Sequence, residues 1–471
     1  MRKYILLICI AGFLASCSDS LLDRTPVDEL VPETAYENLD DLEAAINGIF
    51  SGGNGLSYTQ VIRFNSIISD NVTIGGNNGG QELALLNQIV DTQTNSLGIW
   101  SNHYQIANRC NRAIQASELI TFDENNISEA RRFNRALATA FALRAYAHYE
   151  LLNYYGEDNL NPNSMGVPYQ DQVSTTAAPE RPTTGETVQR ILDDLATAES
   201  LLDGIIVNDP INISQDFVKF LRARVGLMTA DWPLVIGNTN DLIDDYPLAN
   251  PAQYLEMFTS DADVTEVIFK YENQLGFNRN YANIWIFTGS GGNFISLANG
   301  LFDELAARGD VRFQVNVNPE SDPGDFGINK YPGIGGQFLG DFKAMRVSEA
   351  YLMRAEAHAR GSNDFGAAAA DVKAIRDARA GADTGNVEFS SLNDAIRGIR
   401  DERRLELAFE GHRFIDLKRY RNILNQGMER DPRDCDGNIP CELTVNDRRW
   451  TLPIPIGESN GNPNIEQNPD W

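Results

Sequence analysis

The stretch IRDERRLELAFEGHRFIDLKRY, from Ile399 to Tyr420 of this 471-residue chain, decides the fold. Its apolar residues recur with a helical period, which predicts one helix over residues 392–421. Glu402, Glu406 and Glu410 fall on one face of that helix, and arginines nearby in the sequence can neutralise them. Glycoside hydrolysis needs two carboxylates that flank a bond from both sides. Carboxylates on one helix face point the same way, so the pattern favours an ion-paired structural helix over a catalytic pair.

Helical periodicity recurs along most of the chain and predicts a mostly α protein. Two stretches follow one plan: a helix rich in small residues, then Asp231-Trp232 or Asp364-Phe365, then a second helix. Such pairs resemble tetratricopeptide-like units, although the strict consensus of that repeat is absent. The predicted helices span residues 40–50, 101–120, 129–155, 186–203, 215–230, 232–245, 347–360, 364–380 and 392–421.

Polar stretches rich in Gly and Asn separate these helices and predict long loops. The tail over residues 450–471 contains four prolines, which predicts an extended conformation. No low-complexity tract or linker divides the chain, so we expect residues 33–471 to form a single domain with few short strands. The predicted loops cover residues 52–58, 75–81, 276–293 and 310–342.

The amino terminus has the features of a bacterial lipoprotein signal. Arg2-Lys3 precede an apolar run, which closes on Leu14-Ala15-Ser16-Cys17. The run is shorter than the roughly 20 residues that span a bilayer, so it is expected to be a cleaved targeting segment, residues 1–16. The thiol of Cys17 would then carry the lipid, such as palmitate, and residues 17–32 would form a tether. The alternative is a plain secretory signal with an incidental cysteine.

The charge of the chain restricts its ligands. Lys and Arg number 39 against 66 Asp and Glu, which gives a net charge of −27. Such a surface repels nucleic acid phosphates and anionic headgroups. A polyanionic ligand is also disfavoured unless a local basic patch overrides the global field, so a neutral ligand is the default expectation.

The cysteines near the carboxyl end predict a disulfide. Turn-forming residues separate Cys435 from Cys441 and would bring the two thiols together, as expected of an exported protein. Acidic and amide side chains crowd the same loop, which raises the alternative of a calcium site, but the distal Glu of a calcium-loop motif is absent. With four His in the chain, a zinc site has few ligands, and we expect no metal and no cofactor. The candidate calcium ligands are Asp431, Asp434, Asp436 and Asn438.

The motifs of the chain, taken in order, resemble the SusD/RagB family, the surface glycan-capture lipoproteins of Bacteroidota. The opening stretch is similar to the C-terminal signature of that family, and with the lipoprotein signal the resemblance covers essentially the whole chain. The other matching segments are Trp100 with Tyr104 and Asn108, Phe141–Tyr146, Tyr155–Gly156, Gly166–Pro168, Arg346–Arg360, Leu452–Pro455, Asn462–Asn464 and Gln467–Pro469.

This resemblance implies a SusD-like fold with four tetratricopeptide-like helix pairs and a loop-rich face that binds carbohydrate. It also implies a lipid-anchored protein at the cell surface of the outer membrane. There it would cover a TonB-dependent transporter of the SusC type and deliver oligosaccharide to it, while other proteins cut the polymer. The repeat face would meet the transporter.

Sugar recognition needs a flat aromatic face and polar groups at the edge of the sugar ring. Two loops supply both, and a strand-like alternation with Ile284 and Ile286 leaves a buried role open for the aromatic residues among them. The family's sugar-contacting residues vary between members, so no motif assigns them here. The candidates are Trp285, Tyr281, Phe287, Asn283, Arg279, Asn293, Asn77, Asn78, Gln81 and Tyr58.

The sequence thus predicts a non-catalytic glycan-binding lipoprotein, with a neutral glycan as ligand. One rival is a surface glycosidase or lyase that would depend on Glu406 or Glu410. A second rival is a peptide-binding protein of the same fold. No Ser/His/Asp or Cys/His signature supports another chemistry.

Overall fold

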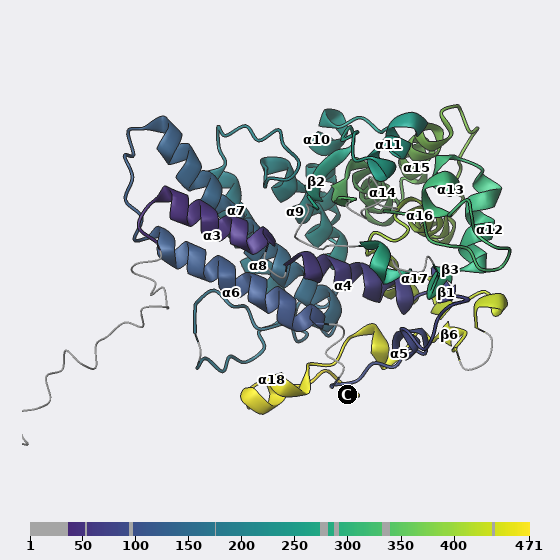
Figure 1. Cartoon of the computed structure of the whole chain (residues 1–471), viewed down its shortest axis with the longest axis horizontal. Coiled ribbons are helices and arrows are strands. Elements are labelled where there is room, and N and C mark those ends of the chain that lie inside the picture. The colour runs from purple at the N-terminus through teal and green to yellow at the C-terminus, as the bar shows by residue number, and fades with distance from the viewer. Residues whose placement is uncertain are drawn as a thin grey trace, which may run out of the picture.

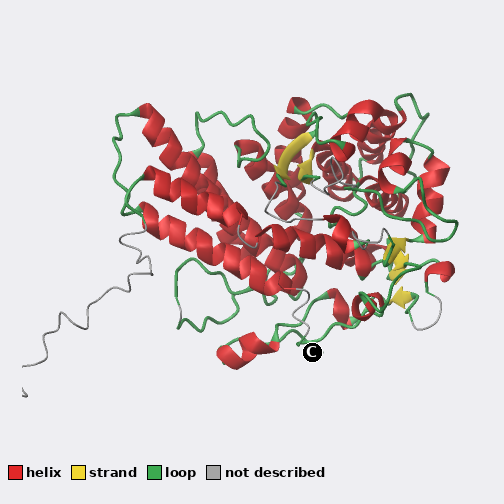
Figure 2. Ribbon diagram, in the orientation of Figure 1, coloured by secondary structure: helices red, strands yellow, loops and turns green. Residues whose placement is uncertain are grey.

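The computed structural model is mostly helical, as predicted (Figure 2). Cys17, Arg279, Phe287, Asp436 and Asn438 lie outside the residues that it describes, so what the sequence predicts for them stays a prediction. The structure describes residues 36–51, 54–93, 98–174, 176–273, 281–286, 292–331, 340–435 and 439–471.

The helices follow the predicted segments closely and add several that the sequence did not indicate, among them α4, α11, α12, α13 and α18. The first half contains α3 (Leu39–Ser51), α4 (Asn54–Ile67), α5 (Leu83–Leu86), α6 (Ile99–Ser117), α7 (Ile127–Tyr155), α8 (Thr184–Leu201), α9 (Gln215–Thr229) and α10 (Trp232–Asp245). The second half contains α11 (Pro251–Thr259), α12 (Asn299–Arg308), α13 (Val311–Asn316), α14 (Val347–Ala357), α15 (Phe365–Ala380), α16 (Leu392–Glu406), α17 (Arg413–Leu424) and α18 (Ile456–Gly461).

The strands are short and form antiparallel pairs that lie far apart in the sequence. β1 (Val72–Ile74) pairs with β3 (Ile295–Leu297), and β2 (Val267–Tyr271) pairs with β4 (Phe342–Arg346). β5 (Met428–Glu429) pairs with β6 (Glu442–Leu443). The first two pairs tie the loop-rich middle of the chain to its first and last thirds.

Consecutive helices pack as pairs, and the pairs form the body of the molecule. α6 packs on α7, α9 on α10, α14 on α15, and α16 on α17. Figure 1 shows α3, α6 and α7 at one end of the molecule and α12 to α16 at the other. α4 runs between the two groups and contacts both α6 and α17.

The shared plan of the two helix pairs has a local cause. Asp231 caps α10 by accepting a hydrogen bond from the Leu234 N–H, and Asp364 caps α15 by accepting one from the Ala367 N–H. Where α9 meets α10, a Cβ on Gly226 would lie 3.0 Å from a Val235 methyl carbon. The small residue therefore lets the two helices approach closely.

The single helix predicted over residues 392–421 is wrong, because the chain breaks between α16 and α17. Phe409 and Gly411 have φ angles of 62° and 89°, in the left-handed region that a helix excludes. At Gly411 a Cβ would meet the Val61 side chain at 2.9 Å, so glycine also permits the close approach of α4. The tail likewise departs from the prediction, since α18 interrupts its extended run.

Candidate functional site

The three carboxylates of the opening stretch lie in a buried network of ion pairs. Glu406 Oε1 is 2.8 Å from Arg346 Nη1 and 2.7 Å from Arg379 Nη2. Glu410 Oε1 is 2.7 Å from Arg346 Nη2, even though the helix has already ended before it. Each arginine comes from a distant segment, so the network joins α16 to β4 and α15.

These carboxylates are held in their ionised form. Burial alone would raise the pKa of Glu406, but the guanidinium groups of Arg379 and Arg346 outweigh it and hold that pKa well below its usual range. Against burial, Arg312 lowers the pKa of Glu402, and Arg346 with Lys330 lowers the pKa of Glu410. A general acid of a glycosidase needs a raised pKa. The network therefore suits a structural role and not proton donation.

The loops predicted to carry polar candidates converge at the β1–β3 pair. We call this surface the β1–β3 face; it comprises residues 74–82, 283–286, 292–296 and 318–327. Gly75 N–H donates to Phe294 O at 3.1 Å, and Asn77 N–H donates to Asn293 O at 2.9 Å. A Cβ on Gly75 would lie 2.4 Å from Asn293 O, so only glycine permits this approach. Two segments more than two hundred residues apart thus share one surface.

The polar candidates divide into buried and accessible residues. Asn78 is buried, and its Nδ2 donates to Gln81 O at 2.8 Å and to Phe294 O at 2.7 Å, so it holds the face together. Gln81 and Asn283 are exposed, and Asn293 is half-buried. The accessible amides can therefore donate to and accept from the hydroxyls of a ligand.

Three of the aromatic candidates belong to the core. Trp285 and Tyr281 are each 1% exposed and Tyr58 is 4% exposed. The Trp285 ring packs edge-on against Phe409 at 5.4 Å between ring centroids. Tyr58 lies 4.0 Å from the Tyr271 ring centroid. All three side chains are buried in the folded chain, which corrects the prediction that they present a flat face to a ligand.

Sequence reasoning missed the residues at the centre of the β1–β3 face. The Asp325 carboxylate accepts a hydrogen bond from the Ser296 hydroxyl, and its backbone oxygen lies 3.4 Å from Asn293 Nδ2. The next residue, Phe326, is half-buried and stacks on Phe302 at 3.7 Å between centroids. The Asp-Pro-Gly-Asp segment that ends at Asp325 indicates only a turn, and nothing local shows which strand it meets.

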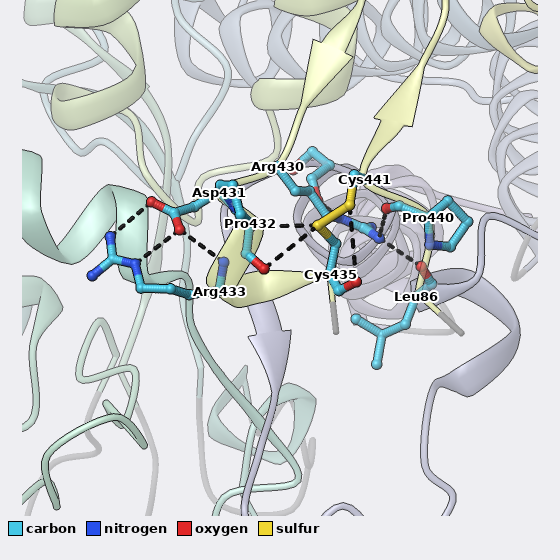
Figure 3. Close-up of a disulfide and its surroundings, with 9 residues drawn as sticks. Leu86, Arg430, Asp431, Pro432, Arg433, Cys435, Pro440 and Cys441 are labelled. Atoms are coloured by element: carbon cyan, nitrogen blue, oxygen red, sulfur yellow. Dashed lines mark hydrogen bonds and ion pairs between the residues drawn. A yellow bond between two sulfur atoms is a disulfide. The ribbon is translucent and has the colours of Figure 1, made fainter. Parts of the chain in front are cut away.

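The cysteine loop is closed by the predicted disulfide between Cys435 and Cys441 (Figure 3). The Asp431 carboxylate accepts from the Arg433 guanidinium at 2.7 Å. Asp434 Oδ1 accepts from Asn299 Nδ2 at 2.7 Å. Two of the four candidate calcium ligands are thus already engaged by the protein.

No described helix is long and apolar enough to cross a membrane. Among the described residues, no three His, Cys, Asp or Glu side chains gather in a group that could hold a metal ion.

This chain is similar in sequence to two protein families and to several known proteins. Residues 335–471 match the model of the SusD family, and residues 22–211 match a model described as starch-binding associating with outer membrane. A SusD-like protein P2 from Formosa agariphila is 25% identical over 99% of both chains. A SusD-like protein from Bacteroides ovatus is 27% identical over 58% of this chain and 48% of its own.

Solved structures share the fold. A SusD superfamily protein from Bacteroides thetaiotaomicron has a TM-score of 0.80 at 23% identity, over 92% of this chain and 100% of its own. A putative sugar binding protein from Bacteroides vulgatus has a TM-score of 0.78 at 23% identity, over 93% of this chain and 100% of its own. At this identity the likeness shows the fold.

Proposed function

Because this chain belongs to the SusD family, we propose that it binds carbohydrate at the surface of the outer membrane, does not cleave it, and delivers it to a SusC-type transporter. The family model matched by its first half is described as starch-binding and associated with the outer membrane. One solved relative in fold is named a putative sugar binding protein.

The observation that carries this proposal is the polar edge of the β1–β3 face. Exposed Gln81 and Asn283 and half-buried Asn293 and Asp325 belong to the segments that meet at this face. Amides and a carboxylate supply both donors and acceptors, which is what the hydroxyls of a sugar require. Phe326 offers an apolar surface beside them. Arg279 and Phe287, which lie outside the described residues, are proposed to extend this site.

The state of the carboxylates supports binding without cleavage. Glu406 and Glu410 are each bound by arginines and are buried, so neither reaches a glycosidic bond. The net charge of −27 favours a neutral glycan at an exposed surface, because an acidic polymer would be repelled. A peptide ligand remains the second candidate, since amide-rich loops also bind peptide backbones.

The anchor and the transporter follow from the family and from the signal sequence. Lipid on Cys17 would hold the protein at the membrane, and the helix pairs would face the transporter while the β1–β3 face binds sugar. Labelling with radioactive palmitate tests the anchor: wild type should incorporate label and a Cys17→Ala variant should not. Co-purification with a TonB-dependent transporter tests the partner.

Titration calorimetry with a panel of neutral oligosaccharides, starch fragments included, tests the binding. We expect one panel member to bind, with an affinity that falls about tenfold in an Asn293→Ala, Asn283→Ala double variant, roughly 1.4 kcal/mol. Gln189→Ala on α8, an exposed amide outside the β1–β3 face, is the matched control and should bind like wild type. Unchanged affinity in the double variant would reject this site.

A further inference from the structure

A cleft between the helix pairs forms a second site that the carbohydrate role leaves unused. It lies among α7, α9, α14, α16 and α17, and none of its residues belongs to the β1–β3 face. Its apolar lining residues include Tyr149, Leu227, Met228 and Ile415. Its charged and titratable lining residues are Arg224, Arg403, Lys418, Arg419 and Arg421 together with Glu157, Asp158, Glu349, Asp416 and His412.

Lys418 is the most unusual of these residues. It is buried, and its ammonium donates to Asn153 O at 2.7 Å. Within the described residues no carboxylate lies within 4.0 Å of it, so two of its three donors have no protein partner. Burial, and then the charge of Arg421, lowers the pKa of Lys418 to about 7. Because a buried ammonium without a counter-ion is unfavourable, an anion here would stabilise it.

Two arginines beside Lys418 also keep donors without partners. Arg403 is 2% exposed; its Nε donates to Asp416 at 2.9 Å, but its Nη1 has no hydrogen-bond partner. Arg421 donates to Lys418 O through Nη1, and its buried Nε has no partner. Both unpartnered atoms belong to residues that line the cleft.

The acids of the cleft pair with three of its arginines and leave Lys418 and Arg421 without a carboxylate. Glu349 is bound by Arg224 at 2.6 Å and lies 3.8 Å from Arg403, and Asp416 is shared between Arg403 and Arg419. Asp158 is exposed. In a chain with a net charge of −27, a buried Lys418 that no described carboxylate approaches within 4.0 Å is a local exception.

Arg430, a buried arginine outside the cleft, shows that a cation without a carboxylate partner can still have its donors hydrogen-bonded. Arg430 also has no carboxylate bound to it, yet it donates to five backbone oxygens. The folded chain thus satisfies Arg430 internally but leaves donors of Lys418 and Arg403 without a hydrogen-bond partner. Because buried donors in folded proteins are usually paired, the two remaining donors of Lys418 make this cleft a candidate site for a ligand.

We propose that this cleft binds a small organic monocarboxylate, whose carboxylate accepts hydrogen bonds from Lys418 and its neighbouring arginines while its apolar part packs against Leu227 and Met228. A single negative charge fits, because Asp158 and Glu157, which also line the cleft, oppose a more highly charged anion. The apolar lining residues select an organic acid over an inorganic one. This site is separate from the carbohydrate site and does not depend on it.

Calorimetry on the purified full-length protein tests the proposal with benzoate as the probe. Benzyl alcohol is its neutral counterpart, and sulfate controls for general anion binding, all at one ionic strength. We expect benzoate to bind at least tenfold more tightly than benzyl alcohol and than sulfate. Equal affinities, or no binding of benzoate at a concentration of about 10 mM, would overturn the proposal.

Proton uptake supplies a readout specific to Lys418. At pH 8 a group with a pKa near 7 is mostly neutral, and a bound carboxylate raises that pKa, so binding should take up close to one proton. Titration in two buffers of different ionisation enthalpy measures it. Lys418→Met should abolish the uptake and weaken binding at least tenfold, while Lys373→Gln, a lysine on α15 outside the cleft, should change neither. If Lys418→Met does not fold, Arg421→Gln should still weaken binding; carboxylate binding by wild type without proton uptake would contradict the assignment.

Discussion

The buried ion-pair network and the β1–β3 face are both built from polar side chains, but these side chains have opposite roles. In the network, Glu406 is enclosed by arginines from three segments and has no contact with solvent. At the β1–β3 face, Gln81 and Asn283 extend into solvent from loops that the backbone holds together. Polar groups that are fully paired determine the shape of the molecule, and those that remain accessible can bind a ligand.

The largest effect should come from breaking the network. Glu406→Gln removes the charge that Arg346 and Arg379 share and leaves buried cations unmatched, at a cost of about 3–5 kcal/mol in the free energy of unfolding. Chemical denaturation measures it. Glu388→Gln, at an exposed position, is the control and should change stability by less than about 0.5 kcal/mol. A Glu406→Gln variant as stable as that control would show that the network does not hold the fold.

Acid should weaken the helical body in a defined range of pH. The pKa of Glu356 is about 2, because Arg419 and Arg360 outweigh the effect of burial. The pKa of Glu349 is also about 2, because nearby cations, above all Arg224, outweigh the effect of burial there. A carboxyl group with a lowered pKa stabilises the folded state fully above its unfolded value near 4.5, and that contribution is lost as the pH falls toward 2. Burial also lowers the pKa values of His103, His148 and His412 from 6.5, so thermal midpoints should begin to fall below about pH 6.5 and fall more steeply below pH 4.5, where the two carboxyl groups lose their contribution. A midpoint that stays level down to pH 3 would contradict this assignment.

The disulfide should contribute a smaller, local stabilisation. A bond between Cys435 and Cys441 closes a short loop, for which loop-closure entropy gives about 2 kcal/mol. Denaturation of a double Cys→Ser variant measures it, with wild type under oxidising conditions as reference. Because Arg430, which directly follows β5, donates to Leu86 O at 2.7 Å, the loss of stability should stay confined to the cysteine loop and leave sugar affinity unchanged. Loss of sugar binding in this variant would place the site elsewhere.

The smallest effect on stability is expected at the β1–β3 face. Gln81→Ala should change the free energy of unfolding by less than about 0.5 kcal/mol, because the side chain is exposed. Its sugar affinity should nevertheless fall by roughly threefold, as expected for one lost hydrogen bond at an open site. Calorimetry and denaturation on one preparation sharpen the comparison. The network variant should show the reverse pattern, with stability lost and affinity kept while the protein is folded.

The helices were predictable because their signals are local. The two helix pairs that meet at Asp231 and Asp364 each depend on a helix cap beside a turn. A few consecutive residues of the sequence indicate both features. The break at Phe409 and Gly411 was not predictable, because the helical period continues through it and only the packing of α4 against Gly411 shows why the chain turns.

The site was less predictable than the fold. The alternation around Trp285 is the same for a buried and an exposed strand, and the residue that covers it, Phe409, lies more than a hundred positions away. Asp325 becomes notable only once it meets Ser296 and Asn293 across the β1–β3 pair. Long-range contacts decide which of many polar loop residues form a surface.

The central claim is that the β1–β3 face binds carbohydrate and leaves it intact. The most direct test is a crystal structure of the protein grown with the oligosaccharide that binds best in calorimetry. It should show an unbroken oligosaccharide within hydrogen-bonding distance of Asn283, Asn293 or Asp325. A cleaved sugar beside Glu406 or Glu410, or one bound away from the β1–β3 face, would contradict it.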